Sequence, residues 1–362
     1  MNDEIFSDEP TRLSETIVKL FAGQTGGTPP VVLAGESRAE LTVGADAQDD
    51  CAVFRLTGDQ ELVVGSDYVR GPKFRLYEMG VLDEYDLGYY LVAANVSDVA
   101  AMGARPIGLL SVVRYPREMT DFVFGRVMEG IRAACADFGC PNVGGDIGGA
   151  ERLILSASAL GICRPGDTLL RRGACPGDVV CLTSPTGLAG AAMEYFRSRR
   201  VDDVIEAAHR DTLMASWKRP QARVREGVAL AESRVVTSCQ DTSDGLKATL
   251  ESIAWSSGVG ITVYERDLPV LPAVAAVCEH LGVNALSTVM GDSVDFELVF
   301  TVPPSQVEPL RAEFGTQGLD FCSIGLVTAD QETTLHWADG SRTSLPGKAW
   351  RHAPDRPGGL RV

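Results

Sequence analysis

Short apolar runs separated by turn residues fill the first half of the chain, a pattern typical of a sheet packed against helices. Alternating apolar and polar positions predict half-buried strands, whereas apolar residues three and four apart predict one face of a helix. Glycine and proline between the runs mark the turns. We therefore expect a short helix at about 12–22, strands at 51–56, 61–66, 107–113 and 152–162, helices through 92–104 and over 118–138, and loops at 1–10 and about 21–40.

A stretch rich in proline, glycine and charge, CRPGDTLLRRGACPGD at 163–178, interrupts this pattern. Beyond it strands and helices alternate, which indicates helices layered on a sheet. The expected strands are 179–183, 234–239, 260–264, 296–302 and 321–327, and the expected helices are 186–198, 203–215, 221–232, 245–256, 272–281 and 304–315. We predict a two-domain α+β or α/β fold, divided near residue 165 into an N-terminal segment with a short helix (1–40), an N-terminal domain (41–165) and a C-terminal α/β domain (166–362).

The charge of the chain excludes several kinds of partner. It has 49 acidic and 33 basic side chains, a formal net charge of −16. Nucleic acids and anionic membranes attract basic surfaces, so we expect neither as a partner. The nine cysteines form no CxxC pair, and the N-terminal stretch MNDEIFSDEP has no apolar core. These features favour a reduced, cytoplasmic protein.

Aspartates recur at the ends of apolar strands and inside apolar helices, where an isolated charge is costly. The segment VAANVSDVAAMGA (92–104) places Asp98 within a helix of small apolar residues. A hard divalent cation such as Mg²⁺ binds carboxylate oxygens and often brings a phosphate with it. A shared metal site is therefore our hypothesis for a set of aspartates, namely Asp49, Asp50, Asp67, Asp98, Asp146, Asp241, Asp244 and Asp295.

These aspartates also have structural interpretations. An aspartate beside serine or glycine commonly caps a helix or forms a turn, which applies to Asp244 before the segment GLKATL. Asp49 is more typical of a solvated carboxylate in a turn than of a metal ligand. The segment VGGDIGG (143–149) is typical of a glycine loop whose N–H groups bind a phosphate, although the usual nucleotide-binding glycine motifs are absent. The sequence leaves open whether the aspartates converge.

Several segments, in their order and spacing, resemble the thiamine-monophosphate kinase family. That family is a branch of a superfamily with aminoimidazole-ribonucleotide synthetase, selenophosphate synthetase and a hydrogenase-maturation dehydratase. The resemblance spans roughly 40–352 and is most specific around Asp98 and 241–245. The matching segments are DDCAVF, VVGSDYVRGPKF, LVAANVSDVAAMGARP, VGGDIGG, LLRRGACPGDVVCLT, KRPQAR, DTSDGL, DFELVFTV and a late WRH.

This resemblance implies an ATP-binding synthetase-like fold whose N-terminal mixed sheet pairs with that of a second copy in a homodimer. It implies that ATP and Mg²⁺ bind between the domains and that phosphoryl passes from ATP to thiamine monophosphate. The implied metal ligands are Asp50, Ser66, Asp67, Asp98, Asp146 and Asp241, with Asp98 and Asp241 as the catalytic residues. The implied nucleotide contacts are Gly145, Asp146, Arg171, Ser243 and Asp244, and the implied acceptor contacts are Lys73, Val294, Asp295 and Trp350.

Some positions depart from the family pattern. The substituted residues are Gln48 for a glycine, Ile147 and Gly148 for threonines, Lys73 for an acceptor-side histidine and Val294 for an acidic residue. A lost carboxylate and a gained ammonium favour an anionic acceptor without a ring cation. Two other functions stay open: an ATP-dependent synthetase or dehydratase of the same superfamily that releases the phosphate, and a non-catalytic dimeric scaffold. The retained carboxylates argue against the scaffold, which has no need of clustered like charge.

Overall fold

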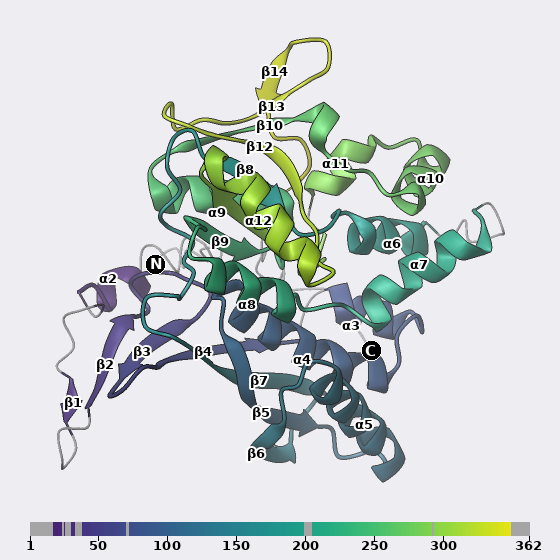
Figure 1. Cartoon of the computed structure of the whole chain (residues 1–362). Coiled ribbons are helices and arrows are strands. Elements are labelled where there is room, and N and C mark those ends of the chain that lie inside the picture. Colours follow the sequence, from purple (N-terminus) through teal and green to yellow (C-terminus); the bar gives the residue numbers. More distant parts are fainter. Residues whose placement is uncertain are drawn as a thin grey trace, which may run out of the picture.

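Two seven-stranded mixed sheets with packed helices form the protein (Figure 1). The computed structural model describes residues 17–23, 25, 30–32, 38–69, 72–198, 205–291 and 293–348. The first sheet is built from residues up to 163 and the second from residue 179 onward. This architecture confirms the predicted fold class, while the boundary near residue 165 stays a prediction.

The N-terminal sheet has the strand order β1-β2-β3-β4-β7-β5-β6, and only β5 and β6 run parallel. The strands expected at 51–56, 61–66, 107–113 and 152–162 are confirmed to within a few residues. The helix expected at 12–22 is described only as α2, because residues 12–16 lie outside the described part. The strands are β1 (Val31–Val32), β2 (Arg38–Val43), β3 (Ala52–Leu56), β4 (Glu61–Tyr68), β5 (Arg105–Tyr115), β6 (Asn142–Gly149) and β7 (Ile154–Cys163), and the helices are α2 (Val18–Leu20), α3 (Pro72–Glu78), α4 (Glu84–Ala101) and α5 (Asp121–Asp137).

The segment 143–149 is not the loop that we expected but lies in β6, at the edge of the sheet. All of β6 is exposed or half-buried, so no apolar alternation marks it as a strand in the sequence. A Cβ on Gly145, where φ is +142°, would lie 1.7 Å from the carbonyl oxygen of Ser111. Glycine therefore lets β6 approach β5 closely enough to pair with it.

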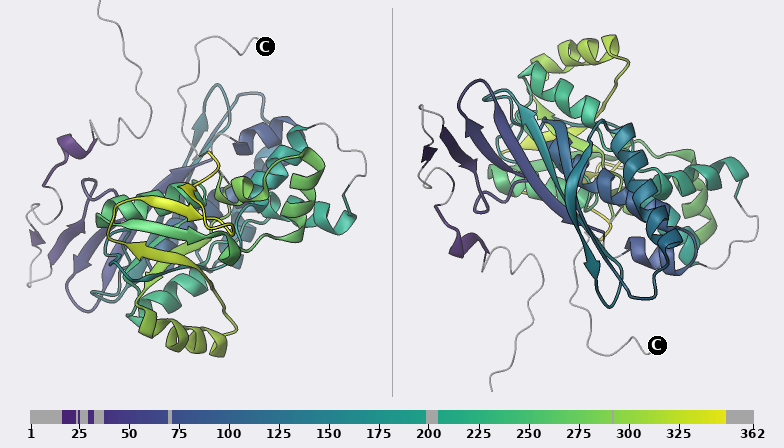
Figure 2. Two further views of the ribbon diagram at one scale, coloured as in Figure 1. Left: turned by 90° about the horizontal axis from the view of Figure 1, so that it is seen from above. Right: turned by 90° about the horizontal axis from the view of Figure 1, so that it is seen from below.

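The two faces of the N-terminal sheet have different surroundings. Helix α4 packs against β4, β5 and β7 and also against α5, so this pair covers the inner face (Figure 2). One row in register across β4, β7, β5 and β6 is Asp67, Ala157, Ser111 and Gly145, and it lies on the inner face, where Ala157 and Ser111 are buried. The next row, Tyr68, Ser156, Val112 and Asp146, lies on the outer face.

Helix α4 links the two halves of the molecule. Asp83 and Asp86 form a capping box at its N-terminus, and most of its side chains are buried. Besides the N-terminal sheet, it contacts α7, α8 and β9 of the C-terminal half. Residues on α4 can therefore reach a site shared by both halves.

The C-terminal sheet has the order β14-β13-β10-β12-β8-β11-β9. Strand β10 (Gly260–Tyr264) and helix α10 (Pro272–Leu281) have the predicted bounds, and the other expected elements of this half are confirmed with shifts of up to four residues, whereas α4 begins eight residues before the expected 92–104. Besides β6, sequence patterns missed α3, α11, β13, β14, the turn η2, and also β1 and β2, which lie wholly or partly in the segment expected as a loop at about 21–40. The remaining strands are β8 (Val179–Leu182), β9 (Ser238–Asp241), β11 (Leu298–Val302), β12 (Cys322–Thr328), β13 (Thr333–His336) and β14 (Arg342–Ser344), and the remaining helices are α6 (Leu188–Arg197), α7 (Ala207–Lys218), α8 (Val224–Ser233), α9 (Leu246–Ser257), the 3₁₀ turn η2 (Glu265–Asp267), α11 (Ala285–Met290) and α12 (Pro304–Thr316).

Among the described helices, none has the length and apolar character needed to span a membrane.

Candidate active site

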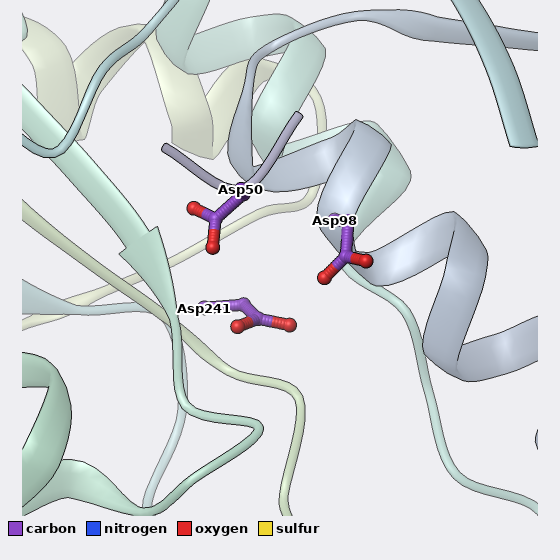
Figure 3. A group of neighbouring side chains, drawn as sticks. All are labelled: Asp50, Asp98 and Asp241. Carbon is purple, nitrogen blue, oxygen red and sulfur yellow. The ribbon is translucent and has the colours of Figure 1, made fainter. Parts of the chain in front are cut away.

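Three aspartates from separate elements meet between the two halves of the molecule (Figure 3). Asp50 precedes β3, Asp98 lies in α4 and Asp241 ends β9. One carboxylate oxygen from each residue lies within 4.8 Å of those from the other two, and we call these three residues the triad. Within the described ranges, no other group of three acidic, cysteine or histidine side chains comes this close.

Hydrogen bonds from both halves hold Asp241 in place. The hydroxyl of Ser97, on α4, donates to Oδ2 of Asp241 at 2.5 Å. Ser243 donates to Oδ1 from its hydroxyl at 2.8 Å and from its backbone N–H at 3.3 Å. Because Asp241 belongs to the C-terminal sheet and Ser97 to the N-terminal half, the position of this carboxylate depends on how the two halves are joined.

A fourth carboxylate, that of Asp67, lies on the inner face of β4 beside the triad. Its backbone N–H donates to Oδ1 of Asn95 at 2.9 Å. Asn95 lies one turn before Asp98 on α4 and also donates to the carbonyl of Leu91 at 2.9 Å. The charge of Asp67 contributes to raising the pKa of Asp98, which shows that the two groups are close.

Arg171 brings positive charge to the triad. Its guanidinium bonds Asp50, and its backbone N–H donates to Oδ1 of Asp49 at 3.2 Å. Asp49 is therefore a hydrogen-bonded, half-buried residue rather than the solvated turn residue that the sequence favoured. The segment between the two sheets is anchored in this way to the loop before β3.

Burial and mutual repulsion raise the pKa values of these aspartates. Burial is the largest cause for Asp98, whose pKa is well above its usual value, with Asp241, Asp50 and Asp67 adding repulsion. Burial and the charge of Asp50 raise the pKa of Asp241 to about 7, against the hydrogen bonds from Ser97 and Ser243. Burial and Asp50 likewise raise the pKa of Asp49 to about 7. The site thus concentrates negative charge that a bound cation would stabilise.

Two of the implied metal ligands do not join the triad. Asp146 lies on the outer face of the N-terminal sheet, opposite the face that carries Asp67, and forms an ion pair with Arg114. The hydroxyl of Ser66 also lies on the outer face and donates to the carbonyl of Ala157 at 2.7 Å. Asp146 could not be assigned to a face beforehand, because the segment that forms β6 was expected to be a loop.

Two of the residues that the resemblance implies at the acceptor are engaged within the protein itself, one by hydrogen bonds and one by burial in the core. Asp295 accepts the backbone N–H groups of Gly187 (2.6 Å) and Ala189 (3.0 Å) at the start of α6. Val294 is 5% exposed and belongs to the hydrophobic core. The side chain of Lys73 and all of Trp350 lie outside the described part. Val294 is therefore not exposed to an acceptor, whereas the role of Asp295 at the acceptor stays a prediction.

Of the residues that the resemblance implies at the nucleotide, some lie at the triad and others lie away from it. Arg171 and Ser243 lie at the triad, as described above. Gly145 shares the inner-face row of Asp67, three strands away. Asp244 is exposed, and the helix that follows begins with Gly245 at its N-cap and no side-chain cap. The capping interpretation of Asp244 is thus wrong.

A cavity of about 780 Å³ lies between α3, α6, α7, α11 and the segment near residue 348. Its lining includes Arg75, Arg197, Trp217, Asn284 and Lys348. The indole of Trp217 stacks on Tyr90 of α4 with ring centroids 6.2 Å apart. Asp98 lies eight residues further along α4, about 12 Å. The cavity has the volume of a small-molecule site.

Sequence patterns missed an ion pair that is connected to the triad through the backbone next to Asp241. Arg223 donates to the buried carboxylate of Glu297 from Nε at 2.7 Å and from a terminal nitrogen at 2.5 Å. The backbone of Glu297 bonds Thr242, the residue after Asp241, through both its N–H and its carbonyl. The only signal in the sequence was the pair of motifs KRPQAR and DFELVFTV, which contain Arg223 and Glu297.

Comparison with known proteins places the chain in a family. The model of the N-terminal domain of AIR synthase related proteins matches residues 48–163, and that of the C-terminal domain matches residues 175–338. The chain is 30% identical over 318 residues to thiamine-monophosphate kinase of Escherichia coli K12, covering 87% of this chain and 93% of that protein. It is 33% identical over 230 residues to the Pyrococcus abyssi thiamine-monophosphate kinase, covering 63% and 69%.

Solved structures share the fold. AaThiL complexed with AMPPCP and TMP superimposes with a TM-score of 0.71 at 25% identity, covering 84% of this chain and 91% of that one. The hydrogenase maturation protein HypE of E. coli shares the fold at a TM-score of 0.63 and 21% identity. Together with the matched sequence over both domains, these findings show that the chain belongs to the AIR synthase related family and, within it, to the thiamine-monophosphate kinases.

Proposed function

We propose that this protein transfers the terminal phosphoryl group of ATP to the phosphate of thiamine monophosphate, giving thiamine diphosphate and ADP. The observation that carries the proposal is the triad, which joins both halves of the chain. It is supported by the relatives named thiamine-monophosphate kinase and by the neighbour that binds AMPPCP and TMP. In this reaction a phosphate oxygen of the acceptor bonds to the γ-phosphorus while the bond from that phosphorus to the β-phosphate bridging oxygen breaks.

The triad fits a magnesium ion. It offers carboxylate oxygens from three residues, which is the donor type that Mg²⁺ prefers. Oδ2 of Asp50 is buried and has no hydrogen-bond partner among the described residues, as expected for an oxygen kept for a cation. Asp50, Asp98 and Asp241 would hold the ion, with Asp67 beside them. Bound there, Mg²⁺ neutralises charge on the transferring phosphoryl group.

Side chains around the triad would orient the two substrates. Arg171 is fixed between Asp49 and Asp50 and supplies positive charge for a phosphate. We assign further nucleotide contacts to Ser243, Gly145 and Asp244. Phosphoryl transfer needs positioning and charge neutralisation more than covalent chemistry, so these roles suffice.

The organic part of the acceptor would occupy the cavity lined by Trp217 and Lys348. The lining combines an aromatic face with polar side chains, as small-molecule sites usually do. The sequence argument for a more anionic acceptor relied on Lys73 and Val294. Since Val294 is buried in the core, thiamine monophosphate is the better-supported acceptor.

The protein would act as a homodimer that covers the outer face of the N-terminal sheet. This face exposes Tyr68 (44%), Leu110 (41%) and Ile154 (38%). Exposed apolar groups in one sheet face mark an interaction surface. A second copy with the same face is the partner that the resemblance in sequence implies, and cytoplasmic location is our accompanying expectation.

Steady-state kinetics with Mg-ATP and thiamine monophosphate test the proposed function. We expect thiamine diphosphate and ADP in equal amounts, and no orthophosphate. A stoichiometric release of orthophosphate would instead indicate a synthetase or dehydratase. Absence of any ATP consumption with a folded dimer would indicate the scaffold and overturn the proposal. No observation in the structure favours either of these alternatives.

A further inference from the structure

Gln48 combines two unfavourable features in one residue. Its backbone has a φ of +52°, in the left-handed region that favours glycine. Its side-chain nitrogen Nε2 is buried and has no hydrogen-bond partner among the described residues. A buried polar group without a partner destabilises a fold, and so does a strained backbone. Two such costs in one residue indicate a role outside folding.

The position of Gln48 connects it with the triad. It precedes Asp49 and Asp50 directly, so its Cα lies at most about 7.6 Å from that of Asp50. Arg171 is bonded to both of these aspartates. Nε of Arg171 is a second buried nitrogen that has no partner in the described part of the chain.

The chemistry of these two groups points to an anionic ligand. Both are N–H donors without an acceptor among the described residues, and Arg171 lacks one at Nε although its guanidinium bonds Asp50. The described part of the chain therefore does not supply the acceptor that they need. A phosphoryl oxygen next to the triad would satisfy an N–H donor, and its charge would strengthen the hydrogen bond.

We propose that Gln48 is a binding residue whose side-chain amide donates a hydrogen bond to a phosphoryl oxygen at the triad. This inference rests on the proposed function, because both substrates of that reaction carry phosphate. The oxygen belongs either to the nucleotide or to thiamine monophosphate. The amide thereby positions the phosphate, and its hydrogen bond outweighs the cost of the backbone conformation.

Two substitutions separate binding from backbone strain. Gln48→Gly removes the amide and relieves the positive φ, whereas Gln48→Leu removes the amide and keeps the strain. Gln331→Gly is the matched control, because Gln331 is also a glutamine at positive φ (+59°) but is exposed, in the turn between β12 and β13. Its amide donates only a 3.3 Å bond to the carbonyl of Gly258.

Calorimetry on the full-length protein with Mg²⁺ is the measurement, with AMPPCP in one arm and thiamine monophosphate in the other. We expect both Gln48 variants to bind one of the two ligands about ten- to a hundred-fold more weakly, as for loss of a hydrogen bond to a charged group. The weakened arm identifies the source of the oxygen. Gln331→Gly should bind both ligands normally, and Tm should rise in both glycine variants.

Unchanged dissociation constants in both arms for both Gln48 variants would overturn the inference, whatever the Tm. Binding of Mn²⁺ alone should stay within twofold in the variants, since the amide is not a metal ligand. If metal binding falls as much as ligand binding, the residue only shapes the metal loop and the inference is wrong. Failure of the unaltered protein to bind either ligand would refute the proposed function as well, which distinguishes the two failures.

Discussion

Replacing Asp241 by asparagine should make the metal-free protein more stable and the enzyme inactive. The substitution keeps the shape of the side chain and removes one charge from the triad. Two unit charges at 4.8 Å, the upper limit for the oxygens that the triad brings together, repel each other by about 3 kcal/mol at an effective dielectric constant of 20. The rise in the pKa of Asp241 from 3.8 to about 7 corresponds to a cost of similar size, about 4 kcal/mol at neutral pH.

The sign follows from the direction of the pKa change. Because the carboxyl has a higher pKa in the folded than in the unfolded state, it destabilises the fold as pH rises from about 4 to about 7. An asparagine at this position carries no charge, so it does not destabilise the fold in this way. The asparagine loses one hydrogen bond, however, because its amide oxygen can replace only one of the two carboxylate oxygens that accept from Ser97 and Ser243, and this loss costs about 1 kcal/mol. We expect a net gain of about 1–3 kcal/mol, or several degrees in Tm.

Mg-ATP, in contrast, should stabilise the unaltered protein more than it stabilises Asp241→Asn. A ligand present at a hundred times its dissociation constant stabilises the native state by about 2.7 kcal/mol. The unaltered protein should show a stabilisation of this order with Mg-ATP, and Asp241→Asn should show little or none. Turnover should fall at least a hundred-fold, since phosphoryl transfer depends on charge neutralisation.

Thermal unfolding in EDTA and in Mg-ATP, beside steady-state turnover, tests this reasoning. Asp167→Asn is the matched control, because Asp167 is also buried but pairs with Arg234 at 2.8 Å, away from the triad. That control should lower Tm and leave turnover per folded molecule unchanged. If Asp241→Asn instead melts lower in EDTA and keeps normal turnover, the triad is a structural cluster and its assignment to a metal is refuted.

Four further outcomes are expected. Binding of AMPPCP measured by calorimetry should weaken strongly under chelation, and equal binding without metal would contradict the magnesium site. Leu110→Glu, on the exposed outer face, should convert a dimer into a monomer by light scattering, whereas a monomeric unaltered protein at micromolar concentration would refute the interface. Arg223→Leu should lower stability by about 3–5 kcal/mol in denaturant unfolding, because it leaves Glu297 buried without its cation, and an effect under 1 kcal/mol would remove the support role of this pair. With thiamine monophosphate the unaltered protein should reach a kcat/KM of about 10⁴ M⁻¹s⁻¹ or more, and a value far below this would restore the hypothesis of a more anionic acceptor.

The periodicity of the apolar residues, together with the turn residues, was enough to predict the elements that have a distinct apolar face. Strand β10 and helix α10 have the predicted bounds because glycine or proline marks their ends and buried aliphatic residues fill them. Strand β6 was missed because an exposed, glycine-rich edge strand has no apolar face to detect. That single error also concealed the position of Asp146, since the face of a residue follows from the strand register.

The candidate site was predictable in chemistry and only partly in geometry. The hypothesis that Asp98 shares a site with other aspartates is supported by Asp50 and Asp241, which each place a carboxylate oxygen within 4.8 Å of one of its own, while the cation between them stays a proposal. Asp295 follows the same sequence pattern but caps α6 through backbone N–H groups. An aspartate before an apolar run is thus compatible with either role, and only the tertiary arrangement decides between them.

The small residues of α4 explain how such a charge can lie on so buried a helix. A Cβ on Gly88 would lie 2.1 Å from the carbonyl of Val127, and one on Gly130 would lie 2.0 Å from that of Tyr85, so α4 and α5 touch at backbone distance. On the opposite side, a Cβ on Gly227 of α8 would lie 2.1 Å from the carbonyl of Ala100. Close packing on both sides fixes the axis of α4. Because Asp98 is carried on this fixed axis, a shift of α4 is a costly way to separate it from Asp50 and Asp241, and we expect a bound cation to relieve the repulsion within the triad instead.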